Sequence, residues 1–411
     1  MKKFVVLLFV MILLFSFSVT GQATDINSDN YRFIVIGDTR PSFTGAPFSP
    51  AYMKILEEIN WINPDFVIHT GDLIFGYGES GEILRDDYGR ALELLSMVNP
   101  KIYYVPGNHD YQSPEAADYF AQLSGYKDGY YSFDAHGATF IILNTDIPGQ
   151  LGQITGEQRE WLEKTLLNAR DAKAIFVFMH RPLFSFLLPD EDQRGDIPES
   201  DCNFISKKAK NDLLDLLTKY SITAVIAGHE HLFYHTEYKG IPFYTVGGGG
   251  APFSTSPEKG GFFHYLIVNV HNDNISYKIM EPYHFSVDTK VITENGVSRG
   301  EALIHNIDGE LQSGLIQLNG IKFTLPKGDY TVKIEPAITI EQLVKVGEAT
   351  GLLKESTSLD ASSQLLKLFK PTFFKVEPHP QNDQVVNAWV GVNALGSLPI
   401  RVTVQLKDSS E

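Results

Sequence analysis

The stretch that decides the fold is Ile222-Thr-Ala-Val-Ile-Ala-Gly-His-Glu-His231, an apolar run that ends in a glycine and two histidines spaced one residue apart. Four earlier stretches have the same form, in which a short apolar run is followed by side chains that bind metals well. These side chains are Asp38; Asp72; Asn108, His109 and Asp110; and His180. Short apolar runs are typical of strands that are buried on both faces of a layered α/β domain. The repetition therefore predicts an α/β domain whose strand ends carry ligand-type side chains.

These strand ends predict a metal site. Ligands of open α/β sheets lie outside the carboxyl ends of the strands, so we expect the five sets of side chains to meet. Oxygen and imidazole ligands without a thiolate suit divalent ions such as Mn, Fe or Zn, and not a closed structural zinc site. Taken singly, Asp38 and Asp72 fit turn caps and His180 fits a core histidine. Taken together, the set indicates catalysis, because nothing structural requires so many ligand-type residues at one edge. Four further histidines are interpreted as structural: His69, His235, His264 and His271.

Length and charge limit the kinds of partner. The chain has 411 residues, enough for two domains, and a formal net charge of −16. A chain this acidic lacks the basic surface that binds nucleic acid in general, so we expect no general nucleic-acid binding. An anionic substrate must then be held by local positive charge, namely metal ions with an arginine or two.

The first 23 residues have the organisation of a signal peptide. Lys2 and Lys3 precede the apolar segment 4–19, and small residues up to Ala23 give a cleavage point. The apolar segment is shorter than the roughly 20 residues of a spanning helix, although a retained signal anchor fits the same pattern. We expect an extracytoplasmic protein (secreted, periplasmic or at the cell surface) with no stable membrane association after cleavage of the leader. The single Cys202 excludes an internal disulfide.

Helices are expected between the strands. After about residue 285 the helical spacing of apolar residues mostly disappears. Apolar spacing predicts helices at 49–62, 86–98, 155–167 and 207–220, the third opening with a capping box of Thr155 and Gln158. Residues 187–204 are expected to form an irregular loop beside the site. We place a catalytic domain at 31–284 and a β-rich C-terminal domain of unknown role at 300–411, with short helices at 343–353 and 359–369.

The order of these motifs resembles the calcineurin-like metallophosphoesterase family, which is related to the purple acid phosphatases. The family pattern is D-x-H, G-D-x-x, G-N-H-[DE], H and G-H-x-H, and the matching residues run from Asp38 to His231, about half of the chain. The resemblance implies two stacked mixed β-sheets flanked by helices, which the strand pattern alone does not give. It also implies an enzyme that hydrolyses a small phosphomonoester or phosphodiester by attack of a metal-bound hydroxide.

The same resemblance implies a centre of two divalent metal ions, Mn, Fe or Zn. The implied ligands are Asp72, which bridges both ions; Asn108, His180 and His229 for one ion; and Asp38 and His231 for the other.

Four further roles concern the substrate. By resemblance, His109 would protonate the leaving oxygen or stabilise the transition state, and Asp110 would orient its ring. Asn108 would also contact the substrate. Arg181 is a candidate phosphate contact because it follows His180 directly.

The sequence departs from the family pattern at Arg40, where the family has a histidine ligand. A guanidinium stays charged and has no lone pair for a metal. Phe75 stands where the purple acid phosphatases have a tyrosine ligand. We therefore expect a weaker or exchangeable ion at Asp38 and His231, with Arg40 contacting the substrate phosphate.

Two alternatives stay open at this point. One is a catalytically weakened family member that binds a phosphorylated ligand or a surface partner. The other is an exported nucleotidase, in which Phe373, Phe374 and Trp389 would clamp a base, although core packing is the more common role of strand aromatics.

Overall fold

The computed structural model describes residues 30–187, 207–272, 274–283, 285–306, 315–338, 369–395 and 399–407. The expected leader lies outside the described residues, as do almost all of the expected loop at 187–204 and both short helices expected at 343–353 and 359–369. Within the described ranges, no helix is both long and apolar enough to cross a bilayer.

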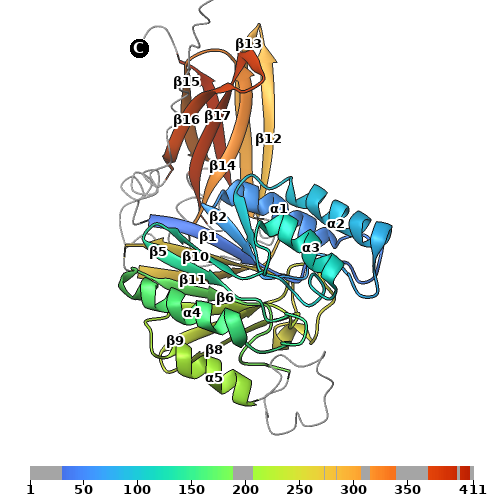
Figure 1. Cartoon of the computed structure of the whole chain (residues 1–411). Helices are drawn as coiled ribbons and strands as arrows, with labels where there is room; N and C mark the ends of the chain where they lie inside the picture. Colours follow the sequence, from blue (N-terminus) through green and yellow to red (C-terminus); the bar gives the residue numbers. More distant parts are fainter. Residues whose placement is uncertain are drawn as a thin grey trace, which may run out of the picture.

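Two β-sheets stacked face to face form the N-terminal part of the protein (Figure 1). The first sheet has the order β11 (Asn274–Met280), β10 (Tyr265–His271), β1 (Asn30–Ile36), β2 (Phe66–His69) and β3 (Lys101–Tyr104). The second has the order β4 (Tyr131–Ala135), β5 (Ala138–Ile142), β6 (Ile175–Phe178), β7 (Ala224–Ala227), β9 (Ile241–Val246) and β8 (Phe233–Tyr238). This is the pair of mixed sheets that the resemblance implies.

The core between the sheets is rich in phenylalanine because the central strands are buried on both faces. Every residue of β2 and of β6 is buried. The ring centroid of Phe33 lies 5.2 Å from that of Phe66, which is also in the first sheet. It lies 5.2 Å from that of Phe176, which is in the second sheet. Burying a phenylalanine side chain stabilises a fold by about 1.5–3 kcal/mol. This aromatic layer therefore fixes the two sheets against each other.

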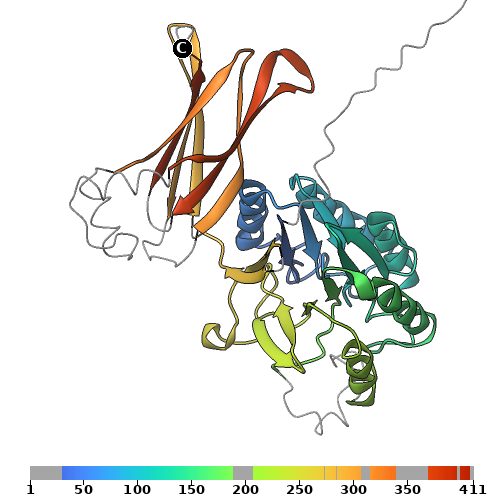
Figure 2. The same ribbon diagram turned by 90° about the vertical axis from the view of Figure 1, so that its left-hand side faces the viewer.

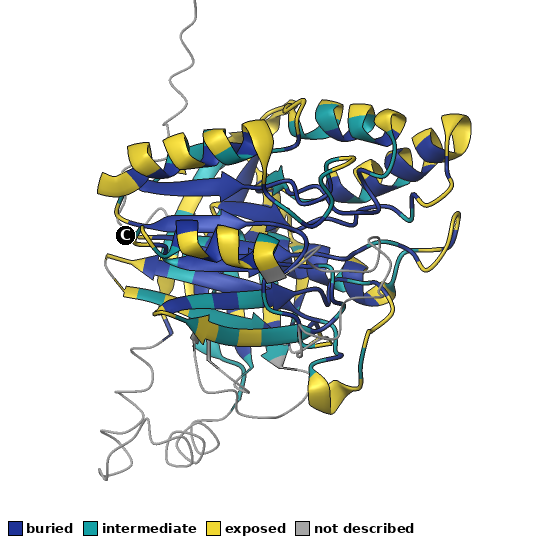
Figure 3. Ribbon diagram, turned by 60° about the horizontal axis from the view of Figure 1, so that its bottom comes forward, coloured by how far each residue is buried: buried dark blue, intermediate teal, exposed yellow. Residues whose placement is uncertain are grey.

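Helices cover the outer faces of both sheets. On the first sheet lie α1 (Pro50–Ile62), α2 (Gly81–Leu95) and α3 (Pro114–Ser124); on the second lie α4 (Gly156–Asn168) and α5 (Lys207–Leu217). Two short 3₁₀ helices, η1 (Ala169–Asp171) and η4 (Pro257–Lys259), lie in connecting segments. Figure 3 shows the strands largely in dark blue and the outward faces of the helices in yellow. The helix expected at 49–62 is confirmed, and Ser49 caps it by accepting the backbone N–H of Ala51.

Other helical expectations differ from the structure. Helix α2 begins at Gly81, ahead of the expected start at 86, and α3 was not expected at all. The capping box of α4 is wrong, because Thr155 donates its hydroxyl to Gln150. Gln158 is buried and exchanges two hydrogen bonds with the backbone of Asn144, at 2.8 and 2.9 Å. Gln158 therefore ties α4 to the end of β5 instead of capping it.

The C-terminal part is a sandwich of two antiparallel sheets (Figure 2). One sheet has the order β12 (Phe285–Glu294), β13 (Val297–Asn306), β18 (Ile400–Leu406) and β15 (Tyr330–Pro336). The other has the order β14 (Leu315–Pro326), β17 (Asn382–Leu395) and β16 (Pro371–His379). The β-rich character is as expected, and its first strand begins at Phe285, ahead of the expected boundary at 300.

The aromatic residues of this sandwich divide between its two faces. Phe374 packs against the hydrophobic core. Trp389 is half-buried and alternates with the core residues Ala388 and Val390, so it lies on the opposite face of its sheet. Its indole N–H donates to Glu377 at 2.9 Å. Core packing was therefore the right expectation for Phe374 and the wrong one for Trp389.

The sandwich shares its core with α1. One hydrophobic cluster contains Ile55 and Ile59 of α1 together with Leu318 and Ile321 of β14. The pairing register of β14 shifts between these last two residues, and Gly320 lies in the shift. A Cβ atom at Gly320 would come within 1.8 Å of the backbone oxygen of Asn60. Close approach at this glycine therefore sets how the sandwich packs on the helix.

We predict that Gly320→Ala destabilises the protein by about 1–3 kcal/mol, because backbone must move to admit the methyl group. The matched control is Gly89→Ala on the exposed side of α2, where a Cβ meets nothing within 4 Å. Removing a glycine from a helix without strain stabilises by about 0.4–1 kcal/mol. Thermal denaturation of both variants measures the contrast, and equal melting temperatures would contradict the proposed contact.

A buried carboxyl group also joins α1 to its neighbours. Glu58 accepts the hydroxyl of Tyr265 and the backbone N–H of Tyr283, each at 2.8 Å. Burial raises the pKa of Glu58 to about 7, although the two hydrogen bonds oppose the shift. Because the pKa in the folded state lies above its ordinary value of 4.5, folding favours the protonated form. This contribution is fully present below pH 4.5 and is lost as the pH rises through about 7.

We predict that Glu58→Gln removes this pH-dependent loss of stability. The loss amounts to about 3 kcal/mol at most in the free energy of unfolding. Glutamine keeps an acceptor for Tyr283 and a partner for Tyr265 but carries no charge. Melting temperatures of both proteins, measured from pH 5 to pH 8, should diverge, with the variant more stable at the alkaline end. Parallel curves would contradict a raised pKa for Glu58.

Candidate metal centre

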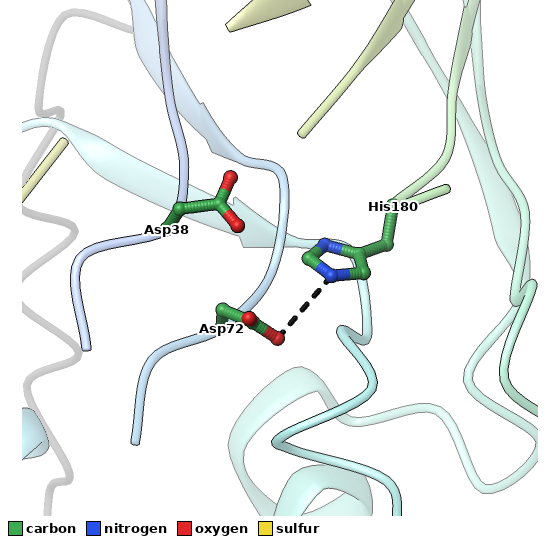
Figure 4. A group of neighbouring side chains, drawn as sticks. All are labelled: Asp38, Asp72 and His180. Atoms are coloured by element: carbon green, nitrogen blue, oxygen red, sulfur yellow. Dashed lines mark ion pairs between the residues drawn. The ribbon is translucent and has the colours of Figure 1, made fainter. Parts of the chain in front are cut away.

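Five loops, each directly after a strand, meet at one edge of the stacked sheets. Strands β1, β2 and β3 run parallel, and so do β5, β6 and β7, so their carboxyl ends lie on the same side. The loops are joined by backbone hydrogen bonds, for example from Asp38 to Gly71 and from Gly228 to His180. Figure 4 shows the side chains of Asp38, Asp72 and His180 turned toward one another, with potential ligand atoms within 4.8 Å. The structure thus brings the expected strand ends together.

The backbone at these strand ends is strained. Asp38, Asp72 and His229 have φ values of 57°, 61° and 71°, in the left-handed region. Each such residue costs about 1–3 kcal/mol relative to ordinary backbone. Residues held in this way cluster at functional sites. Here the strain turns the two carboxylates and one imidazole inward from their strands.

Two motif glycines allow the loops to approach the ligands. A Cβ at Gly107 would lie 2.3 Å from Asp72 Oδ1, and one at Gly228 would lie 2.5 Å from Asp38 Oδ2. Either side chain would therefore displace a carboxylate. This explains why a glycine precedes Asn108 and His229 in the sequence.

Four potential ligand atoms converge on one point: Oδ1 of Asp72, Oδ1 of Asn108, Nε2 of His180 and Nδ1 of His229. Asn108 Oδ1 lies 2.8 Å from His180 Nε2 and 2.9 Å from His229 Nδ1. His180 Nε2 lies 3.3 Å from Asp72 Oδ1. Ligands about 2.1 Å from an ion, at roughly right angles, are about 3 Å apart. The observed separations therefore match the edges of a metal coordination shell.

The hydrogen bonding of His180 shows that a cation belongs there. Its Nδ1 lies 2.8 Å from the carbonyl oxygen of Thr70, which can only accept, so Nδ1 carries the hydrogen and Nε2 has the lone pair. That lone pair faces the oxygens of Asn108 and Asp72. Acceptors at this distance need a shared cation, either a proton or a metal ion. A divalent ion satisfies all four atoms together, whereas one proton does not.

The Asp38 side of the centre has fewer ligands. His231 donates Nδ1–H to the carbonyl oxygen of Pro252 at 2.6 Å, so its Nε2 lone pair faces Asp38 Oδ1 at 3.5 Å. Both oxygens of Asp38 accept the backbone N–H of His229 at 3.0 Å. Arg40 lies beside this pair, with Nε 3.4 Å from Asp72 Oδ2. This half therefore combines two predicted ligands with a fixed positive charge.

The two buried carboxylates have opposite pKa shifts. Burial and repulsion from Asp72 raise the pKa of Asp38 well above its usual range. Burial also acts to raise the pKa of Asp72, but His109, His180 and Arg40 outweigh it and hold that pKa below its usual range. Adjacent carboxylates of this kind cannot both ionise cheaply without a cation between them. The electrostatics therefore agree with the ligand geometry.

His109 has one ring nitrogen available to the centre. Its Nδ1–H donates to the carbonyl oxygen of Phe75, and its Nε2 lies 3.8 Å from Asp72 Oδ2. Burial lowers the pKa of His109, which favours the neutral ring. The ring position is compatible with the proton transfer that we expected.

Asp110 does not orient that ring as we expected. Its carboxylate accepts three backbone N–H groups, from Asp72 at 2.7 Å, Leu73 at 2.8 Å and Gly107 at 3.0 Å. It is fully buried. Asp110 therefore joins the loop that carries Asp72 to the loop that carries Asn108, and it acts on the backbone.

Arg181, the candidate phosphate contact, has a side-chain partner that the sequence did not indicate. Its Nε and one terminal nitrogen each lie 2.8 Å from Asp146 Oδ1, and both side chains are 1% exposed. The guanidinium is thus engaged in a buried ion pair. Its charge still contributes to lowering the pKa of His229, second to burial.

The sequence analysis missed two residues near the centre: Tyr77, which contacts Asn108 and His109, and Glu230, which lies between the two histidines of the motif. Tyr77 is 43% exposed, accepts Asn108 Nδ2–H at 2.5 Å and packs its ring 4.1 Å from that of His109. Glu230, the residue between the two histidines of the motif, is buried and accepts the backbone N–H of Phe186 at 2.9 Å. A charged residue inside a buried motif was an available signal for Glu230. Nothing local indicated Tyr77.

His69 has the structural role that we expected. It is fully buried at the end of β2. Its Nε2 lies 3.0 Å from the hydroxyl of Thr39, and its Nδ1 accepts the backbone N–H of Gly71 at 3.2 Å. Burial lowers the pKa of His69 to about 3, so the ring stays neutral. His69 therefore connects the loops after β1 and β2 without joining the ligands.

Known proteins resemble this chain in sequence. The rat serine/threonine-protein phosphatase CPPED1 is 30% identical over 191 residues, which cover 43% of this chain and 57% of the relative. The 3′,5′-cyclic adenosine monophosphate phosphodiesterase CpdA of Haemophilus influenzae is 23% identical over 209 residues, covering 49% of this chain and 68% of the relative. The chain thus spans little more than half the length of the rat protein.

A dimetal phosphatase from Danio rerio has a similar structure, with a TM-score of 0.42 at 16% identity, covering 61% of this chain and 95% of that one. The sequence model described as calcineurin-like phosphoesterase matches residues 31–233, which contain all six expected metal ligands. Residues 31–233 of this chain therefore belong to the calcineurin-like phosphoesterase family.

Proposed function

We propose that the chain is an exported metal-dependent phosphoesterase that hydrolyses a small phosphomonoester or phosphodiester. The observation that carries this proposal is the convergence of Asp72, Asn108, His180 and His229 on one point, where lone pairs face each other and a cation is needed. Export is proposed from the signal-peptide pattern of residues 1–23.

The residues around that point divide the chemical work. A divalent ion held by Asp72, Asn108, His180 and His229 would supply positive charge to the phosphoryl group and would acidify water. His109 presents Nε2 toward the same space, because its Nδ1–H is engaged by Phe75. A bound phosphate anion raises the pKa of a nearby imidazole. His109 therefore gains a proton as the substrate binds and delivers it to the leaving oxygen.

Asn108 links the ion to the substrate side of the site. Its oxygen faces the two histidines, and its amide nitrogen donates to the exposed Tyr77. Tyr77 packs on the ring of His109 and holds it over the centre. The pair thus positions the leaving group between the proton donor and the ion.

The relatives do not decide between monoesters and diesters as the substrate class. The rat relative is named a phosphatase and the Haemophilus relative a cyclic-nucleotide phosphodiesterase, so monoesters and diesters both belong in the assay. The acidic chain, with a net charge of −16, favours a small substrate over nucleic acid.

A second candidate function is a family member with little or no catalysis, which binds a phosphorylated ligand. The position of Arg40 against Asp72 favours it, because a guanidinium binds phosphate without supplying hydrolysis. The presence of His109 beside the ligands favours the enzyme, since a binding site needs no proton donor.

We predict that Asn108→Ala lowers the metal-dependent turnover by about 10²-fold or more, because it removes a ligand and a contact in the transition state. Turnover is measured on a chromogenic phosphomonoester and its diester, after chelation and re-addition of Mn, Zn, Fe or Mg. Asn274→Ala, at an exposed strand end far along the chain, is the matched control and should keep full activity.

The outcomes separate the two functions. Turnover restored by metal and lost in Asn108→Ala establishes the enzyme, and the preferred ester gives the substrate class. If folded wild-type protein turns over neither ester with any of the four metals, the binding function replaces it.

A further inference from the structure

The two halves of the centre differ in what they offer a cation. One half has the four convergent atoms of Asp72, Asn108, His180 and His229. The other half has Asp38 and His231, with Arg40 beside them. The sequence left open whether Arg40 weakens a second metal site or abolishes the activity.

The backbone holds Arg40 in place against Asp72. The N–H groups of Thr39 and Arg40 both donate to the backbone oxygen of Asp72, at 3.1 and 3.0 Å. Its guanidinium lies over the ring of Phe75, with 5.8 Å between Cζ and the ring centroid, and one terminal nitrogen donates to Pro41 at 3.1 Å. The side chain is only 13% exposed. Arg40 is therefore a fixed cation and not a free surface arginine.

The two oxygens of Asp72 face different positive groups. Oδ1 lies 3.3 Å from His180 Nε2 on the four-ligand side. Oδ2 lies 3.4 Å from Arg40 Nε on the other side. Asp72 therefore bridges the ligand cluster and the guanidinium, as a bridging carboxylate joins two cations.

Charge and ligand count both oppose a further ion beside Arg40. One divalent ion alone balances the two carboxylates of Asp38 and Asp72, and the guanidinium of Arg40 already adds a further positive charge. A second divalent ion would lie against a fixed positive charge in a buried site, where repulsion is weakly screened. Phe75 covers the same side with an apolar ring and supplies no ligand atom.

The Nε of Arg40 is a buried donor whose charge is paired with Asp72 but which forms no hydrogen bond with the residues that the structure describes. Buried donors without partners are uncommon in folded proteins and are often explained by a ligand. Guanidinium groups bind phosphate oxygens through charge-assisted hydrogen bonds.

We propose that this centre binds one divalent ion tightly, on Asp72, Asn108, His180 and His229, and that Arg40 takes the place of a second ion and binds a phosphoryl oxygen of the substrate. The phosphate contact rests on the proposed function, whereas the count of one ion does not.

The metal content of reconstituted protein tests the count. Protein loaded with Mn²⁺ and desalted should contain one ion per chain in the wild type and two in Arg40→His, which replaces the cation by a ligand. The electron paramagnetic resonance spectrum should change in parallel, from an isolated Mn²⁺ ion to a coupled pair. Arg85→His, at an exposed arginine paired with Asp86, controls for an added histidine and should stay at one ion.

Two results would overturn the count: two tightly held ions in the wild type, or one ion in a folded Arg40→His protein whose melting temperature is unchanged. One ion per chain without hydrolysis of any ester would reject the proposed function and leave the count standing.

Binding of inorganic phosphate to the Mn²⁺-loaded protein, measured by calorimetry, tests the phosphate contact. Arg40→Gln should weaken binding about tenfold or more, because it removes a charge-assisted hydrogen bond. Arg85→Gln should leave the affinity unchanged. Equal affinities in the wild type and in Arg40→Gln would overturn the assignment of Arg40 to phosphate.

Discussion

The buried carboxylate of Asp72 is the point on which the rest of the centre depends. Its backbone oxygen accepts the N–H groups of Thr39 and Arg40, its N–H donates to Asp110, and its Oδ1 accepts the N–H of His109. The loops after β1, β2 and β3 are thus connected through one residue. Its two side-chain oxygens then face the ligand cluster on one side and the guanidinium on the other. A buried carboxylate between so many donors is stable only when cations share its charge.

The fold supplies the rigidity that this arrangement needs. Left-handed backbone at Asp38, Asp72 and His229 costs about 1–3 kcal/mol per residue and persists only where the surroundings determine it. The surroundings here are two stacked sheets whose interface is fixed by aromatic rings such as Phe33 and Phe176. Parallel strands place every ligand loop at one edge. The C-terminal sandwich packs against α1, and its buried residues belong to the same hydrophobic cluster as residues of α1 and of the first sheet.

The sequence predicted the strand ends because their signal is local: an apolar run, a glycine, then ligand-type residues. It could not predict the partners of Arg181 and Asp110, because Asp146 and the backbone of Asp72 lie more than thirty residues away along the chain. Helix α3 was missed although Ser113, Pro114 and Gly125 mark both of its ends, so the local signals were present and unused. The packing of Gly320 on α1 depends on a register shift in β14, which has no sequence signature.

The most direct test of this account is the position of a metal ion in crystals of the full chain grown with Mn²⁺ and measured for anomalous scattering. We predict a strong anomalous peak about 2.0–2.3 Å from Asp72 Oδ1, Asn108 Oδ1, His180 Nε2 and His229 Nδ1. Peaks only at other residues, or none in crystals that diffract well, would contradict the claim that these four loops exist to hold a cation.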